Sequence, residues 1–256
     1  MAVSSPPVQR YQPAEAAARV AELRQLAQRL YREKLLEHPF THALRAGTLS
    51  RERIRGFLIN HWTFSLEINT AKSYGYHRWL PFLKRHPEIY DLIVEQLADE
   101  LAHPGPGGHI RMQIPLLAAF GLTEEECAEA ILIPEARAMI DSRVRMFLEG
   151  PMAEAYAAGL SEGSIGQWFG IWYHALTTHY GLTPEQAAYF DVHHEADTRE
   201  HESGRAHVMG NALVIQACLE DGYRPERPGF TLESSVQLAA DLWELFLDGI
   251  MRRYPG

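Results

Sequence analysis

The chain has 256 residues, of which 46% are hydrophobic and 22% are charged, and its formal net charge at pH 7 is -9. This composition is typical of a folded globular protein, and the acidic balance argues against a nucleic-acid partner, because phosphate binding depends on clustered Lys and Arg. No segment approaches the ~20 consecutive apolar residues that span a bilayer. The opening MAVSSPPVQRYQP also lacks the apolar core of a secretory signal. We therefore expect a cytoplasmic protein that binds neither nucleic acid nor a membrane.

Helical periodicity begins after a short lead-in and covers the first half of the chain. Residues 1–12 are rich in serine and proline and predict a mobile tail, and apolar residues then recur at helical spacing until Pro39. A second helix is expected from Ser50, a plausible N-cap, to Pro81. A third begins near Pro87 and ends at a break rich in proline and glycine, residues 104–108.

Helical periodicity continues through the second half of the chain. A helix is expected from His109 to Gly121, and another begins behind the N-cap Thr123. Further helical runs are expected at 134–149, 152–180, 184–207 and 232–254. No useful length alternates with the period of two that marks a half-buried strand. The prediction is an all-α fold with one domain over residues 13–256.

The two cysteines, Cys127 and Cys218, do not form a Cys-x-x-Cys pair. A chain of this length does not need a disulfide for stability. Both are expected to be reduced, buried thiols.

The segment YFDVHHEADTREHESGRAH, residues 189–207, holds the densest group of metal-ligand side chains. On a helix, His193, Asp197 and Glu200 would share one face, because their spacing is i, i+4 and i+7. His194, Asp197 and His201, at i, i+3 and i+7, share another, and spacing alone does not choose between them. A solvated helix face is the alternative to a metal site.

Two further candidates flank the break at residues 104–108. Glu100 ends one helix and His109 begins the next, so the turn between them would let both converge. His103 follows Glu100 at i+3 and offers the Glu-x-x-His pair that di-iron bundles use. Alternatively, His103 stabilises the C-terminus of its helix through the helix dipole.

Glu162 stands among small and apolar residues on a helix that otherwise looks buried. An isolated buried carboxylate is costly, so Glu162 would have to be protonated, paired or bound to a metal, unless it lies at a helix end near solvent. Glu67 is a similar acidic residue on an aromatic-rich helix face, but its pattern is weaker evidence for metal binding.

These residues resemble the haem-oxygenase-like di-iron oxidases, a superfamily that includes an alkene-forming fatty-acid decarboxylase and the chlamydial CADD protein. The resemblance covers roughly residues 30–255, and its most specific parts are Tyr189, Phe190, His193 and Asp197, preceded by HYGL at residues 179–182. The same fold occurs in pyrroloquinoline-quinone synthase and the TenA thiaminases. The resemblance implies a helical bundle of about seven to eight helices.

The resemblance also implies a ligand set. It selects five residues: Glu100, His109, Glu162, His193 and Asp197. The family usually has a histidine three residues after the aspartate, where this chain has Glu200, with His201 one position later. We favour Glu200, because four carboxylates would neutralise two divalent ions in a site of low dielectric. Further candidates, as ligands or as groups that support them, are Glu67, His103, His194 and His201.

The resemblance predicts an enzyme that binds two iron ions per chain and uses O2 to oxidise a small organic substrate, by C–C cleavage, N-oxygenation or desaturation. One source of the electrons that reduce O2 would be an external electron donor. We expect a homodimer, since closed two-fold dimers are the commonest oligomers. Aromatic residues that would line an apolar substrate pocket are Trp62, Phe64, Trp168 and Phe169.

Two alternatives remain open. One is a metal-free oxidase of the same fold, resembling the quinone synthases, in which histidines and arginines contact the substrate directly. Those enzymes keep a basic, tyrosine-rich pocket, whereas this sequence has Ser65, Glu67 and Glu162 at the corresponding positions. The other alternative is a non-catalytic helical protein that binds a partner.

Overall fold

The structure is a computed structural model that describes residues 8–105, 107–198, 207–225 and 230–256. Within these ranges, the side chains of residues 162, 196–198 and 207–208 are not described. Helices are the regular elements throughout these ranges, and the extended residue Gln9 forms one isolated bridge with Tyr223. The predicted all-α fold is confirmed. Residues 1–7 lie outside the described part, and the mobility expected of residues 1–12 stays a prediction.

In the first half of the fold, the helix boundaries lie close to the predicted start and stop signals. Its elements are α1 (Pro13–Tyr31), a π-helical turn (Arg32–Leu36), α2 (Pro39–Arg45), α3 (Arg51–Arg78), α4 (Leu80–Leu83) and α5 (Pro87–Leu101). The side chain of Ser50 accepts a hydrogen bond from the backbone N–H of Arg53 at 3.3 Å, so Ser50 is the N-cap of α3 as predicted. Pro39 begins α2 because a first helical residue needs no N–H partner.

The second half contains shorter helices. Its elements are α6 (Gly108–Arg111), α7 (Gln113–Ala119), α8 (Glu124–Glu129), α9 (Pro134–Glu149), α10 (Met152–Ala157), α11 (Glu162–His179), α12 (Pro184–Thr198), α13 (His207–Gly222) and α14 (Leu232–Arg253). Thr123 forms a capping box with Glu126 at the start of α8. Gly121 follows α7 with φ +65°, the left-handed conformation expected of a C-terminal glycine.

The prediction of seven to eight helices is wrong, because the described residues contain fourteen α-helical segments. Several features add segments: α4 is separate from α3, and the helix expected from His109 to Gly121 is divided into α6 and α7. The segment 152–180 is interrupted between α10 and α11, and α2 begins at a proline that was expected only to end a helix. Helix α13 was missed because NALVIQACL is apolar on most sides and lacks the polar stripe of an amphipathic helix.

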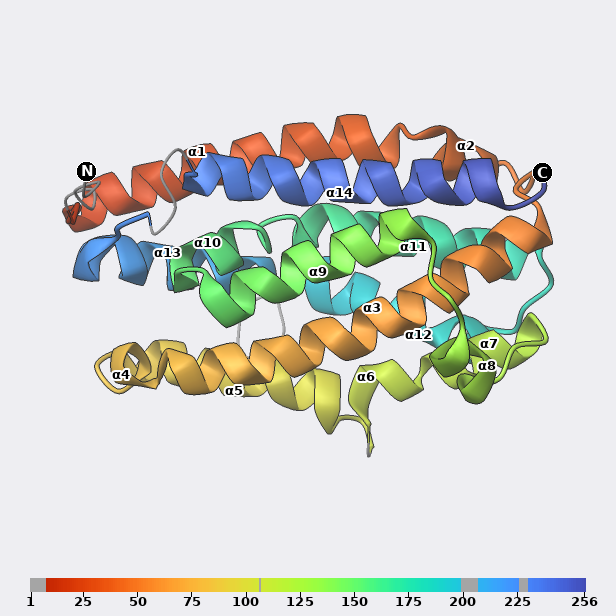
Figure 1. Ribbon diagram of the computed structural model, residues 1–256, viewed down its shortest axis with the longest axis horizontal. Coiled ribbons are helices and arrows are strands. Elements are labelled where there is room, and N and C mark those ends of the chain that lie inside the picture. The colour runs from red at the N-terminus through yellow and green to blue at the C-terminus, as the bar shows by residue number, and fades with distance from the viewer. Residues whose placement is uncertain (1–7, 106, 199–206, 226–229) are drawn as a thin grey trace.

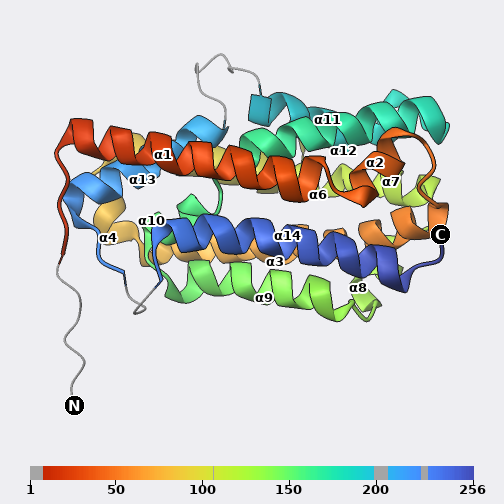
Figure 2. The ribbon, with the colours of Figure 1, turned by 90° about the horizontal axis from the view of Figure 1, so that it is seen from above.

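The helices run mainly along the long axis of the molecule. In Figures 1 and 2, α1 and α14 lie side by side along one face, while α3 and α5 lie along the opposite face. Helices α11 and α12 pack against each other over most of their length. Between these layers lies an aromatic core in which Trp172 stacks on Phe190 with ring centroids 4.9 Å apart. None of the described helices is long and apolar enough to span a membrane.

Both cysteines are buried and free, as predicted. Burial raises the pKa of the Cys127 thiol to about 11, so the thiolate is disfavoured at neutral pH. Cys127 lies on α8 and Cys218 on α13, and both belong to the apolar core.

The turn between α5 and α6 positions two of the predicted ligands. Gly107 and Gly108 have φ values of +90° and +55°, which side chains with a Cβ rarely adopt. The backbone of Gly108 lies against the backbone carbonyl of Glu100, where a Cβ would collide with it. The chain therefore reverses tightly, and α6 begins beside the last turn of α5.

Candidate metal centre

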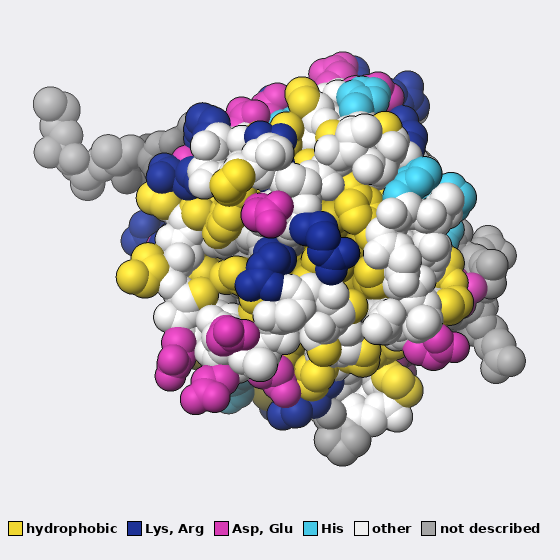
Figure 3. Space-filling model, turned by 90° about the vertical axis from the view of Figure 1, so that its right-hand side faces the viewer, with side chains coloured by type: hydrophobic (Ala, Val, Ile, Leu, Met, Phe, Trp, Pro, Cys, Tyr) yellow, Lys and Arg dark blue, Asp and Glu magenta, His cyan; other side chains and the backbone are white. Residues whose placement is uncertain are grey.

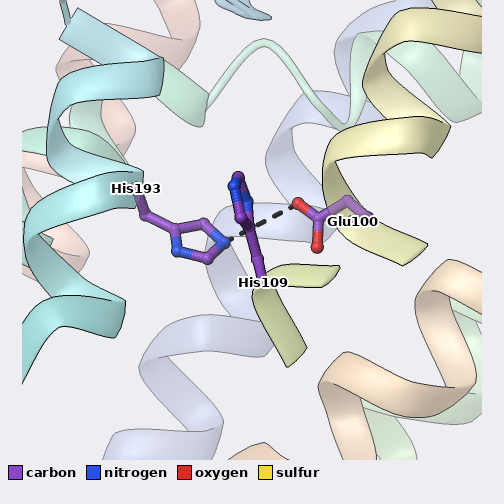
Figure 4. Close-up of side chains that lie close together, drawn as sticks. All are labelled: Glu100, His109 and His193. Atoms are coloured by element: carbon purple, nitrogen blue, oxygen red, sulfur yellow. Dashed lines mark ion pairs between the residues drawn. The ribbon is translucent and has the colours of Figure 1, made fainter. Parts of the chain in front are cut away.

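Three predicted ligands from three helices meet inside the bundle. One ligand atom each of Glu100 on α5, His109 on α6 and His193 on α12 lie within 4.8 Å of one another. Figure 4 shows the three side chains pointing toward one another. The distance from Glu100 Oε1 to His193 Nε2 is 3.7 Å, and the two imidazole ring centroids are 4.8 Å apart. Residues separated by up to 93 positions in sequence are thus brought to one point.

Hydrogen bonds orient two of these ligands. His193 Nδ1 lies 2.8 Å from the backbone carbonyl of Tyr189, and because a carbonyl can only accept, Nδ1 carries the proton. When His193 is protonated, Nε2–H faces Glu100 Oε1 at 3.7 Å, and release of that proton would free the Nε2 lone pair for a metal ion. Asn69 donates to Glu100 Oε2 at 2.9 Å, which leaves Oε1 directed at His193. Such supporting hydrogen bonds to histidine and carboxylate ligands are usual in protein metal sites.

The electrostatics favour an ionised Glu100. Burial by itself raises the pKa of this carboxyl group, but the interaction with protonated His193, together with the positive charges of Lys72 and His109, outweighs burial and holds the pKa well below its usual range. Glu100 therefore presents a carboxylate, the form that binds a metal ion.

The cluster opens onto a cavity of about 120 Å³ between α1, α3, α5, α9, α11, α12 and α14. Among the predicted pocket residues, Phe64 and Phe169 line the cavity, whereas Trp62 and Trp168 are buried elsewhere. Trp168 donates to Thr41 Oγ1 at 2.8 Å and belongs to the aromatic core. Residues of the wall that the sequence did not indicate are Tyr31, His61, Ile68, Asn69, Lys72, Gln96, Arg143 and Trp243.

Three further candidates lie away from the cluster. Glu67 is 39% exposed and receives two hydrogen bonds from Arg137, at 2.8 and 2.6 Å. It points away because Ser65 and Asn69 on the same helix line the cavity, and a residue two positions from each faces the opposite side. His103 is exposed beyond the end of α5. His194 packs on α11, where its Nδ1 lies 2.8 Å from the Gly166 carbonyl.

The structure does not describe the side chains of the remaining predicted ligands. Glu162 is the first residue of α11, and Asp197 follows His193 by four residues on α12, but both side chains lie outside the described part. Glu200 and His201 fall in residues 199–206, which the structure does not describe. The six-residue ligand set of the sequence analysis therefore stays a prediction for these positions.

His61 is a wall residue that the sequence analysis did not assign to the site. It is buried, stacks on Phe57 with ring centroids 5.0 Å apart, and places Nδ1 3.2 Å from Gln113 Oε1. The sequence pattern that could have indicated His61 is the i, i+4, i+8 spacing of His61, Ser65 and Asn69. This spacing puts all three on one face of α3. Burial lowers the pKa of His61 to about 4, so the ring is neutral at pH 7.

We expect the stability of the metal-free protein to fall as the pH drops from 7 toward 4, partly because of His61. Its pKa is about 4 when folded against 6.5 when exposed, so the unfolded chain binds the proton first as the pH falls. The difference between the two pKa values is equivalent to about 3 kcal/mol of unfolding free energy. Urea unfolding of the wild type, His61→Gln and His77→Gln at pH 7 and 4.5 would measure it, His77 being exposed on the same helix. His61→Gln should lose less stability than the other two; equal losses in all three would contradict the assignment.

Solved structures of the same shape identify the fold. A TenA homologue from Pseudomonas syringae pv. tomato matches with a TM-score of 0.70 and 17% identity, covering 97% of this chain and 100% of that chain. A domain with a haem-oxygenase-like fold from Shewanella denitrificans matches with a TM-score of 0.65 and 12% identity, covering 91% and 92%. The haem-oxygenase-like fold expected from the sequence is confirmed.

The chain belongs to the TENA/THI-4/PQQC family, whose sequence profile matches residues 20–198. It is 26% identical over 145 residues to a pyrroloquinoline-quinone synthase of Ruegeria pomeroyi, a match that covers 56% of each chain, so only about half of that enzyme's length is spanned. It is also 25% identical over 231 residues to a 4-aminobenzoate synthase of Nitrosomonas europaea, covering 86% of this chain and 87% of that one. The matched range includes Glu100, His109 and His193.

Proposed function

We propose that this protein is a non-haem di-iron oxygenase or oxidase that uses O2 to oxidise a small organic substrate. The observation that carries the proposal is the cluster of Glu100, His109 and His193, whose ligand atoms lie within 4.8 Å of one another. Two of its members, Glu100 and His193, also line the cavity. Ligands and a substrate-sized space therefore share one wall.

The donor set suits the proposed metal. Carboxylate oxygen and imidazole nitrogen are ligands of iron and manganese, and the cluster contains no thiolate of the kind that favours zinc. Glu100, His109 and His193 would hold one ion, and Glu162, Asp197 and Glu200 are the proposed further ligands that a second ion would require. When bound, the iron would supply the activation of dioxygen that amino-acid side chains do not provide.

The side chains of the chain itself would position the metal and substrate. Asn69 holds one oxygen of Glu100, and the Tyr189 carbonyl holds the ring of His193, so neither ligand needs to rotate when an ion binds. Phe64, Phe169 and Trp243 give the cavity apolar walls that exclude water and hold an apolar substrate group. The proposal includes a cytoplasmic homodimer and electrons from an external donor.

The similar proteins support an enzyme of this kind without identifying its reaction. A pyrroloquinoline-quinone synthase and a 4-aminobenzoate synthase are both enzymes, and the family profile that this chain matches covers the residues of the site. The second resemblance is the longer, at 231 residues. Neither is similar enough to transfer a substrate, since a shared fold does not imply a shared reaction.

Anaerobic titration with ferrous iron followed by a pulse of O2 tests the proposal. We expect about two irons per chain and a transient visible absorption band after the pulse, because the proposed set of six ligands is that of a two-ion carboxylate site. Absence of stoichiometric iron binding would refute the proposal. Binding of one ion only would refute the six-residue ligand set.

A metal-free oxidase is the second candidate, and the cavity wall favours it in one respect. Lys72, Arg143, Tyr31 and Tyr189 make the wall both basic and tyrosine-bearing, as the sequence analysis expected of a quinone-synthase-like pocket. Glu67, which was counted against that alternative, points away from the cavity. Oxygen consumption that persists after complete removal of iron, with a substrate present, would favour this candidate over the first.

A further inference from the structure

His61 is a buried histidine in the wall of the cavity beside the proposed metal centre. It lies on α3, is 2% exposed, and lines the cavity together with Glu100 and His193. Figure 3 shows other histidine side chains on the surface of the molecule, where water can satisfy their ring nitrogens. A buried ring nitrogen needs a partner in the protein or in a ligand, because burying a polar group without a hydrogen bond is costly.

Hydrogen bonds determine which ring nitrogen of His61 carries the proton. Nδ1 lies 3.2 Å from Gln113 Oε1 and 3.4 Å from Ser65 Oγ. The amide oxygen can only accept, and the Ser65 hydroxyl donates to the backbone carbonyl of His61 at 3.0 Å, so it presents a lone pair to Nδ1. Both neighbours therefore accept, and Nδ1 is the donor. Burial also lowers the pKa of His61 to about 4, which keeps the ring neutral at pH 7.

The other ring nitrogen, Nε2, is therefore an acceptor. It makes no hydrogen bond with the described residues and is not sealed off from open space, so it is the nitrogen that a molecule in the cavity can reach. Two other buried histidines differ in this respect, because His38 and His193 each have a partner at both ring nitrogens. A hydrogen-bond donor in the cavity would complete the partners of His61.

The ring of His61 is held in place before any ligand binds. Phe57 stacks on it, with the ring centroids 5.0 Å apart and the ring planes inclined at 22°. Gln113, which is fully buried on α7, holds Nδ1. An acceptor held by packing and by a hydrogen bond loses little conformational entropy when a ligand binds.

Aromatic side chains surround this acceptor. The ring centroids of Phe64, Tyr189, Phe169 and Trp243 lie 5.7, 5.7, 6.2 and 6.4 Å from that of His61, and all four residues line the cavity. A ligand whose donor group reaches Nε2 thus has apolar surfaces beside it for the rest of its body. A few polar groups set among aromatic walls are the usual composition of a small-molecule site.

We propose that His61 Nε2 accepts a hydrogen bond from a hydroxyl or uncharged amino group of the substrate, whose apolar body lies against Phe169 and Trp243. The proposal names the substrate class of the oxidation proposed above and rests on that function. The bound donor group would lie near the metal centre, because the Tyr189 ring contacts both His61 and His193, with centroids 5.7 and 4.4 Å apart. His61 would thus select and orient the substrate.

The cavity volume limits the size of the substrate. A water-sized group needs ~10–15 Å³ in this measure, so a cavity of about 120 Å³ holds roughly ten such groups. A single aromatic ring with small substituents fits, whereas a long unbranched chain exceeds the space.

Binding to the full-length, metal-free protein tests this proposal. The probes are 4-methylphenol and 1,4-dimethylbenzene, which are nearly equal in size, but only the phenol donates a hydrogen bond. We expect isothermal titration to show that the phenol binds roughly tenfold more tightly or better, because the hydrocarbon would leave the buried Nε2 without a partner. 4-Methylaniline, which is an uncharged N–H donor at pH 7, should share the preference.

Variants assign the preference to one side chain. His61→Phe keeps a ring against Phe57 and removes the acceptor, so it should weaken binding of the phenol by about tenfold or more without weakening that of the hydrocarbon. Ser65→Ala is the control in the same wall and should keep the preference, because Gln113 still holds Nδ1. His77→Phe, the same exchange at an exposed position of α3, should change neither affinity. Circular dichroism would confirm that each variant is folded.

Nitrogen NMR of the imidazole ring gives a second readout within the wild-type protein. The His61 signals should show a proton on Nδ1 and none on Nε2. Addition of 4-methylphenol should shift the Nε2 signal, whereas 1,4-dimethylbenzene should shift it much less.

Any of four results would overturn the proposal: no binding of either probe, equal affinity of the wild type for the two, the same loss of preference in Ser65→Ala as in His61→Phe, or a proton on Nε2 in the free protein. Iron is absent from these titrations. A protein that binds the phenol through His61 but takes up no iron would therefore refute the di-iron function and retain the His61 site. A protein that binds iron but shows no preference for the phenol would do the reverse.

Discussion

Replacing His193 by alanine is expected to abolish stoichiometric iron binding, whereas replacing the adjacent His194 should leave it unchanged. His193 Nε2 faces Glu100 at 3.7 Å, and its ring is held by the Tyr189 carbonyl. Loss of hydrogen-bond partners around a metal site alone costs about 10–100-fold in affinity, and loss of a ligand should cost at least the upper end of that range. Ferrous titration under anaerobic conditions, with iron counted per chain after desalting, measures the effect.

The control variant, at His194, removes the same type of side chain but one that points in another direction. His194 is the next residue on the same helix, yet its Nδ1 lies 2.8 Å from the Gly166 carbonyl on α11. The same comparison applies at the other ligand, since His109 lies in the cluster and His103 is exposed six residues earlier. Retention of two irons by both His193→Ala and His109→Ala would refute the proposed centre.

The contrast between His193 and His194 shows what the sequence could and could not predict. Spacing placed either histidine with Asp197 on a helix face, and both registers were compatible with the pattern. The choice depends on how α12 is rotated against α11, which tertiary packing decides. Tyr189, Phe190 and Trp172 bury one side of α12, and that rotation turns His193 to the cavity.

Helix positions were more predictable than helix orientations. The Ser50 and Thr123 caps and the left-handed Gly121 are local signals, and the structure confirms each of them. The direction of Glu67 is not a local property, because α3 carries polar side chains on several faces. Glu67 pairs with Arg137 on α9, a partner seventy residues away that no spacing rule could indicate.

Lys72 and Arg143 illustrate a further limit. Long cationic side chains bury their methylene stems and can direct the charged end in several ways, so a sequence suggests a solvent-exposed position for both. Only the packing of α3 against α9 and α5 places their ends at one cavity. The sequence pattern therefore gave no signal that these two side chains line a cavity.

The turn between α5 and α6 is where local backbone chemistry determines the site, and Gly108→Ala should damage fold and site together. Gly108 has φ +55°, and a Cβ there would collide with the backbone carbonyl of Glu100. The left-handed conformation alone costs an alanine about 1–2 kcal/mol, and relief of the collision requires Glu100 and His109 to move apart. We expect a loss of about 2–4 kcal/mol in the free energy of unfolding, measured with urea, and weaker ferrous binding in the variant that remains folded.

Gly105→Ala is the matched control for this change. It lies in the same turn, its φ is not positive, and an added Cβ would meet no atom within 4 Å. Alanine at that position should be neutral or slightly stabilising, by less than about 1 kcal/mol, because it restricts the unfolded chain without straining the folded one. If Gly108→Ala behaved like Gly105→Ala in both stability and iron binding, the close approach of α6 to the end of α5 could not be what brings Glu100 and His109 together. If stability fell while iron binding stayed at the wild-type level, the turn would support the fold without setting the distance between the two ligands.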